Sequence, residues 1–280
     1  MQLVYSSRCL GYSYKMHIEK PERVADAFEI LASRGYSYVE PTPASEEDVL
    51  RVHTRRWLEE VKNGDFCDQD TPGSEDIFSY ARLSAGGAIL AAKIGGFSLL
   101  RPPGHHAGRD GRALGAKTLG FCYFNNVAIA VKCLGRPTLI LDIDGHHGNG
   151  TQEIFLGDPQ VTYVSLHGGI DFPWTGMESE RNCLNFPLAA KTGNETYLRV
   201  LDSALSLVDA DKVETIAISA GFDAHEGDIA SLGLSSECYR KIGERIRREG
   251  KKVFCVLEGG YSSKIIAECV HNLIQGLEGK

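Results

Sequence analysis

Acidic and imidazole side chains follow directly after an apolar run in the middle of the chain. The run Thr138–Leu141 is typical of a strand buried on both faces, and it is followed by Asp142, Asp144 and His146. Side chains two residues apart on an extended chain point the same way, so Asp144 and His146 share one side and Asp142 lies one step deeper. Oxygen and nitrogen ligands suit zinc and related ions. The alternative is a strand end with a hydrogen-bonded Asp–His pair.

Polar side chains also follow three other predicted strands. The strands expected at 97–100, 216–220 and 253–257 lead into the tandem His105-His106, into Asp223 and into Tyr261. Because the carboxyl ends of parallel strands meet at one edge of a sheet, these side chains can converge with Asp144 and His146. Four strand ends with such side chains favour a metal-dependent site.

Three of these residues form a predicted metal site. Asp144, His146 and Asp223 would bind a divalent ion and leave a fourth position for water or substrate, which is typical of a catalytic site. A bound ion of this kind lowers the pKa of water and polarises a carbonyl group. His147 is expected to support the site without binding the metal. His225 is expected to hydrogen-bond a ligand carboxylate or to face the site.

The tandem histidines can provide acid–base chemistry. His105 and His106 offer a general base and a general acid near neutral pH. Asp142 is placed to hold one imidazole in a fixed tautomer, and Asn149 could hold the other. The hydroxyl of Tyr261 could donate to the oxyanion of a tetrahedral intermediate, although a packed loop tyrosine is the alternative. Together these roles describe hydrolysis of an amide or ester.

Composition restricts the class of protein. The chain has 280 residues and a formal net charge of -7, with 42% hydrophobic and 24% charged residues. This balance indicates a soluble globular protein, and the mild acidity argues against nucleic-acid binding. The 8 cysteines are dispersed without a C-x-x-C pair, which indicates reduced thiols. We find no signal-peptide pattern and no run of membrane-spanning length, so we expect a cytoplasmic protein without membrane contact.

Alternating strand and helix patterns predict an α/β fold. We expect one domain over residues 1–280, with a mainly parallel sheet flanked by helices on both faces. Strands are expected at 2–6, 97–100, 138–141, 161–166, 213–220 and 253–257. Helices are expected at 21–35, 45–52, 77–94, 125–134, 194–208, 235–248 and 265–277. The segment between 166 and 194 is expected to be a long loop.

Six motifs in this order resemble the histone deacetylase family. They are RPPGHHA at 101–107, GFCYFN at 120–125, DIDGHHGNG at 142–150, SLH at 165–167, GFDA at 221–224 and EGGY at 258–261. The resemblance extends from about Tyr14 to the C-terminal helix. The form of the first motif is most similar to the class II and the bacterial or archaeal deacetylase-like amidohydrolase branch.

The resemblance implies an arginase-like fold and zinc-dependent deacetylation of an acylated amine, with one Zn²⁺ per chain bound by Asp144, His146 and Asp223. It also implies a monovalent cation, usually K⁺, near Asp142, Ser165 and Leu166, with the Asp144 and His146 carbonyls as further ligands. The residues that it places around the substrate are Asp70 at the rim, Phe121 and Phe172 as aromatic walls of an acyl-lysine tunnel, and Gly104 and Gly260.

Several alternatives remain open at this point. The substrate could be acetyl-lysine in a protein, an acetylpolyamine or another small acylated amine. An arginase-type dimetal hydrolase is a weaker alternative because Gly148, at the place of its second carboxylate, cannot bind a metal. A non-catalytic module that binds acylated lysine or polyamine without turnover is also a weaker alternative, because every expected catalytic position is filled. The oligomeric state is left open.

Overall fold

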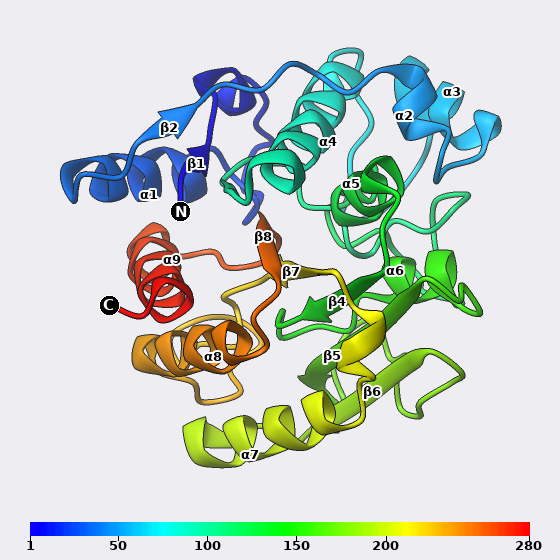
Figure 1. The fold of residues 1–280 in the computed structure, drawn as a ribbon. Coiled ribbons are helices and arrows are strands. Elements are labelled where there is room, and N and C mark those ends of the chain that lie inside the picture. The colour runs from blue at the N-terminus through cyan, green and yellow to red at the C-terminus, as the bar shows by residue number, and fades with distance from the viewer.

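The computed structural model describes residues 1–280 and contains one eight-stranded sheet, in which every neighbouring pair of strands is parallel (Figure 1). The strand order is β2-β1-β3-β8-β7-β4-β5-β6. The strands are β1 (Leu3–Val4), β2 (Tyr38–Val39), β3 (Phe97–Ser98), β4 (Thr138–Asp142), β5 (Val161–Gly168), β6 (Cys183–Leu188), β7 (Thr215–Ala220) and β8 (Lys252–Leu257). The predicted parallel α/β sheet is confirmed.

Helices lie on both sides of this sheet, as predicted (Figure 1). The α-helices are α1 (Glu22–Ser33), α2 (Glu46–Val49), α3 (Arg55–Asn63), α4 (Ile77–Ile94), α5 (Asn126–Leu134), α6 (Asn149–Phe155), α7 (Gly193–Ser206), α8 (Ser236–Arg248) and α9 (Ser263–Glu278). Two short 3₁₀ helices are η1 (Ser7–Leu10) and η2 (Ala210–Lys212). One layer contains α1, α9, α8 and α7, and the other contains α4, α5 and α6 with α2 and α3. No helix combines the length and apolar composition that a membrane crossing requires.

The central strands end at a common level. All five residues of β4 are buried, which explains its continuous apolar sequence. Asp142 at its end lies opposite Ser165 of β5 and Ser219 of β7. β7 is in turn paired with β8 along its whole length. The loops that follow β4, β7 and β8 therefore leave the sheet side by side, as the sequence predicts.

Local capping explains where several helices begin and end. Ser45 and Asp48 form the predicted capping box of α2, with each side chain bonded to the backbone N–H of the other. Asn125 caps α5 by accepting from Ala128 N, and Gly135 ends that helix in a left-handed conformation.

The 8 cysteines are unpaired, in agreement with the sequence prediction.

The structure also contains elements that the sequence did not predict. β6 lies within the segment expected to be a loop; it is an edge strand paired only with β5, which is the position where a residue such as Pro187 is tolerated. α6 opens with Asn149-Gly150, two poor helix formers, and is stabilised by burial. α3 begins at a cap in which Thr54 accepts from Trp57 N. Strands β1 and β3 are shorter than expected.

Leu141→Ala tests the importance of the central strand. The side chain is fully buried, and its truncation is expected to lower the free energy of unfolding by about 2–5 kcal/mol through a residual cavity. Urea unfolding followed by circular dichroism measures the change. Leu207→Ala is the control, because Leu207 is 65% exposed and its change should stay within about 0.5 kcal/mol. Equal losses in the two variants would contradict the packing argument.

Candidate metal centre and active site

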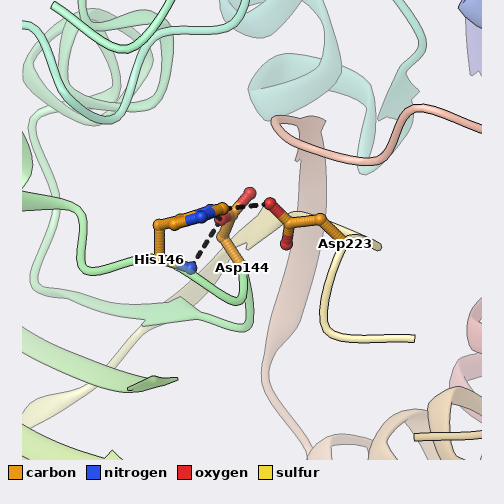
Figure 2. Close-up of side chains that lie close together, drawn as sticks. All are labelled: Asp144, His146 and Asp223. Atoms are coloured by element: carbon orange, nitrogen blue, oxygen red, sulfur yellow. Dashed lines mark hydrogen bonds and ion pairs between the residues drawn. The ribbon is translucent and has the colours of Figure 1, made fainter. Parts of the chain in front are cut away.

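Asp144 and His146, from the loop after β4, meet Asp223 from the loop after β7. One ligand atom from each of the three residues lies within 4.8 Å of the other two (Figure 2). His146 Nδ1 is 2.8 Å from Asp223 Oδ2 and 3.3 Å from Asp144 Oδ1. The structure contains no other cluster of three or more metal-ligating side chains. It thus brings together the three residues that the sequence predicts as ligands.

Backbone N–H groups hold the two carboxylates in place. Asp144 accepts from His146 N at 2.8 Å and from Gly259 N at 2.7 Å, and Asp223 accepts from Gly145 N at 2.7 Å. A Cβ atom at Gly221 would overlap the Asp144 carboxylate, so only glycine allows this close approach. The glycines of the GFDA and EGGY motifs are therefore part of the site.

The charges of this cluster fit a divalent cation. Burial and the charge of Asp144 raise the pKa of Asp223 to about 6. Burial disfavours a charged His146, but the two carboxylates outweigh this effect and raise its pKa well above the usual value. Both carboxylates are at most 1% exposed, so their negative charge needs a cationic partner. Two oxygens and one imidazole nitrogen are a donor set that suits zinc.

The tandem histidines have opposite charge preferences. His105 Nδ1 lies 3.1 Å from Asp142 Oδ2; burial lowers the pKa of His105, but Asp144 and Asp142 together raise it to about 10. His106 Nδ1 lies 2.8 Å from Asn149 Oδ1, and burial with the nearby imidazoles holds its pKa well below the usual value. The centres of the His105 and His106 rings are 4.0 Å apart. His105 therefore carries a proton near neutral pH, whereas His106 is neutral.

The Asp142 carboxylate is held by hydrogen bonds and lies beside the expected potassium ligands. Its carboxylate accepts from the hydroxyl of Tyr163 and from Asp144 N, each at 3.1 Å. Ser165 faces Asp142 across the β4–β5 pair, and Leu166 is the next residue of β5. The hydroxyl of Ser165 forms a 2.8 Å hydrogen bond with His167 Nδ1.

The hydroxyl of Tyr261 hydrogen-bonds to no other protein group, whereas its backbone N–H donates to Asp228 at 2.8 Å. Burial raises the pKa of the Tyr261 phenol well above 10, so the hydroxyl stays protonated and can donate. The ring packs edge-on against Phe121 at 5.8 Å, and the guanidinium of Arg23 lies 4.7 Å from its centre. Gly260, which has φ +111°, allows the turn that places Tyr261.

A buried ionic cluster that the sequence did not predict holds this turn. Arg23 donates to the carbonyls of Gly260 at 2.5 Å and Glu258 at 2.6 Å, and to the Glu19 carboxylate at 2.9 Å. Arg101 binds the same carboxylate at 2.8 and 2.6 Å. Glu19 precedes α1, which begins at Glu22, so no helical-face pattern in the sequence marked this pair.

The glutamate of the EGGY motif also supports the site, which the sequence did not predict. The Glu258 carboxylate accepts from Gly104 N at 2.6 Å and His105 N at 3.1 Å, and burial raises its pKa to about 7. Gly104 itself packs against the start of α5, where a Cβ would lie 2.5 Å from Asn126 N. Glu258 therefore fixes the loop that carries the tandem histidines.

Of the predicted substrate-binding side chains, Phe172 lies beside the metal cluster, and Asp70 contacts the backbone next to Phe121. Phe172 lies 4.9 Å from His106 and 6.3 Å from His146 between ring centres. Asp70 accepts from Gly120 N at 3.1 Å, which fixes the backbone immediately before Phe121.

The structure directs two further histidines of the sequence analysis, His225 and His147, away from the predicted metal ligands. His225 Nδ1 accepts from Gly227 N, and its Nε2 lies 3.2 Å from Ser236 Oγ. The expectation that His225 hydrogen-bonds a ligand carboxylate is wrong, because these neighbours occupy both ring nitrogens. His147 is directed toward Thr175 and Gln152.

The same fold occurs in a solved relative. The HD domain of HDA15 superposes with a TM-score of 0.88 and 30% sequence identity, covering 100% of this chain and 89% of that chain. The predicted deacetylase-like α/β fold is therefore confirmed.

Sequence comparison gives the family. Residues 17–277 match the histone deacetylase domain, and the chain belongs to the histone deacetylase family. It is 36% identical to a probable deacetylase of Methanothermobacter thermautotrophicus, covering 100% of this chain and 91% of the relative. It is 37% identical to acetylpolyamine amidohydrolase 1 of Pseudomonas aeruginosa, covering 65% of this chain and 56% of the relative. The predicted deacetylase-type amidohydrolase is thus confirmed at the level of the family.

Asp223→Ala is expected to abolish stoichiometric zinc binding, because it removes one of three converging ligands. The purified wild type should contain about one zinc per chain by elemental analysis. His225→Ala is the matched control, since His225 lies two residues away but contacts Gly227 and Ser236, and it should keep the metal. Full zinc occupancy in Asp223→Ala would refute the ligand assignment, and two tightly bound ions per wild-type chain would favour a dimetal hydrolase.

Proposed function

We propose that the protein is a zinc-dependent deacetylase that hydrolyses the amide of an acylated amine, and that residues 1–280 act as one catalytic domain. The observation that carries the proposal is the Asp144–His146–Asp223 cluster beside two imidazoles of opposite charge preference. The Tyr261 hydroxyl, which hydrogen-bonds to no other protein group, is free to donate to the substrate.

Each residue then has a defined task. Zinc held by Asp144, His146 and Asp223 would polarise the acyl carbonyl and lower the pKa of water. The neutral His106 accepts a proton from the water that attacks the acyl carbonyl and passes it to the leaving amine, while His105 holds positive charge close to the developing oxyanion. Tyr261 donates its hydroxyl proton in a hydrogen bond to that oxygen.

Apolar side chains near the site favour an acylated lysine within a polypeptide. Ile170 and Trp174 flank Phe172 in the sequence and are 79% and 62% exposed. Met16, 96% exposed, precedes His17, whose ring packs against Phe121 at 4.8 Å. Exposed apolar groups of this kind suit the flanking side chains of a peptide better than the charged chain of a free polyamine. The acetylpolyamine amidohydrolase relative makes an acetylpolyamine the second candidate.

Tyr261→Phe is expected to lower the rate of deacetylation at least roughly tenfold, about 1.4 kcal/mol of barrier, because the oxyanion loses one hydrogen bond. Zinc content should stay at the wild-type level. Tyr197→Phe is the matched control, because the buried Tyr197 hydroxyl also lacks a protein partner but belongs to α7. Unchanged turnover in Tyr261→Phe would exclude its oxyanion role, and a wild type that binds but never hydrolyses acyl-lysine would indicate a binding module.

The substrate class is tested by comparing acetyl-lysine peptides with leucine or serine on both sides, together with acetylspermidine. The leucine peptide should have a kcat/KM about three- to tenfold above that of the serine peptide through burial of apolar surface. Trp174→Ser should remove most of this preference, whereas Leu207→Ser, at the far end of α7, should keep it. Acetylspermidine turned over faster than both peptides would establish the second candidate instead.

A further inference from the structure

Two buried histidines outside the metal cluster hold the segment that carries Phe172. His147 Nδ1 lies 2.7 Å from the Thr175 hydroxyl, and His167 Nε2 lies 3.0 Å from the carbonyl of Gly176. The centres of the two rings are 4.6 Å apart, and both residues are at most 1% exposed. Consecutive residues of one segment are therefore bound by a pair of imidazoles.

The segment has few other polar contacts. From Ile170 to Met177, the hydrogen bonds to the rest of the protein are those of Thr175 and Gly176 with the two histidines. Trp174 N bonds to Asp171 O within the segment itself. Trp174 and Met177 are 62% and 53% exposed, so packing does little to fix the outer part of the segment. Its path past the metal cluster is fixed by these two histidine contacts and by the burial of Pro173.

The donors and acceptors of this contact follow from the surrounding groups. Gln152 Oε1 accepts from Asn185 Nδ2 at 2.8 Å, so its 2.9 Å contact with His147 Nε2 is also one in which it accepts. His147 Nδ1 is then the acceptor, and the Thr175 hydroxyl donates to it.

The donor and acceptor nitrogens of His167 can be assigned in the same way. A carbonyl can only accept, so His167 Nε2 donates to Gly176 O and Nδ1 accepts from the Ser165 hydroxyl. Gly176 has φ +74°, and a Cβ there would lie 2.6 Å from the His147 ring. The segment can therefore approach the histidines this closely only with glycine at this position.

We propose that His147, His167 and Thr175 are positioning residues that fix Phe172 beside the metal cluster and thereby set how the substrate's acylated side chain fits. The ring of Phe172 packs on His106 at 4.9 Å, so its place is defined from one side by the catalytic imidazole. The Thr175 and Gly176 contacts define it from the other side. This inference rests on the proposed deacetylase function, and it assigns a role to His147, the histidine that follows a metal ligand without binding the metal.

The test compares Thr175→Val with Thr175→Ser. Valine has nearly the same shape but lacks the hydroxyl, whereas serine retains it. Thr175→Val should raise KM for an acetyl-lysine peptide about three- to tenfold, the effect of one hydrogen bond, with kcat changed less than about twofold. Thr175→Ser should stay close to the wild type in both constants. Zinc content and melting temperature of all three proteins confirm that the metal cluster and fold are intact.

A second readout does not depend on turnover. The chain has 2 tryptophans, of which Trp57 is buried and Trp174 stands next to Thr175 on the exposed part of the segment. Fluorescence anisotropy decay should therefore show a larger fast-motion component in Thr175→Val than in Thr175→Ser. His167→Gln, whose side-chain amide can still donate to Gly176 O, should show less of this motion than His167→Leu.

The outcomes separate this inference from the proposed function. Equal KM values and equal anisotropy in Thr175→Val and Thr175→Ser would overturn the positioning role. A fall in kcat with unchanged KM would also overturn it, because that pattern indicates a role in the chemical step. A wild type without deacetylase activity would refute the proposed function alone, since the anisotropy of the same variants still decides whether the contact holds the segment.

Discussion

Buried negative charge at the carboxyl edge of the sheet is the constraint on which the site depends. Asp142, Asp144, Asp223 and Glu258 are at most 1% exposed. An unpaired buried carboxylate is costly, so each one is met by backbone N–H groups, imidazoles or a hydroxyl. The glycines around the cluster follow from this need, since Gly259 N reaches Asp144 only because no Cβ intervenes. The same charge raises the pKa of His105 and His146 and makes the cluster suitable for a divalent cation.

A second buried charge network controls the other half of the site. Glu19 lies between Arg23 and Arg101, and Arg23 continues to the carbonyls that precede Tyr261. Breaking such a network by removing one partner typically costs about 3–5 kcal/mol, because the remaining charge stays buried. The position of Tyr261 is therefore coupled to the stability of the N-terminal segment.

The sequence predicted the parts of the molecule whose signals are local. Buried strands have continuous apolar runs, and the residues directly after them could be assigned to one edge of the sheet. β6 was missed because its edge position tolerates Pro187 and half-exposed side chains, and α6 because tertiary burial outweighs the poor helix propensity of Asn149-Gly150. The Arg23–Gly260 contact joins residues 237 positions apart, and no pattern within either segment reveals it.

The strand order has a consequence for how the protein folds. β8 is the last strand of the chain, yet it lies between β3 and β7, near the middle of the sheet. Until β8 has been synthesised, the β2-β1-β3 group shares no strand pairing with the β7-β4-β5-β6 group, and each group exposes an unpaired, apolar edge. The sheet therefore closes only after residue 257 has been synthesised, and the Glu258–Tyr261 loop directly follows this strand. Closure of the sheet and completion of the site are one event, so a partly folded chain would be exposed to aggregation without having any activity.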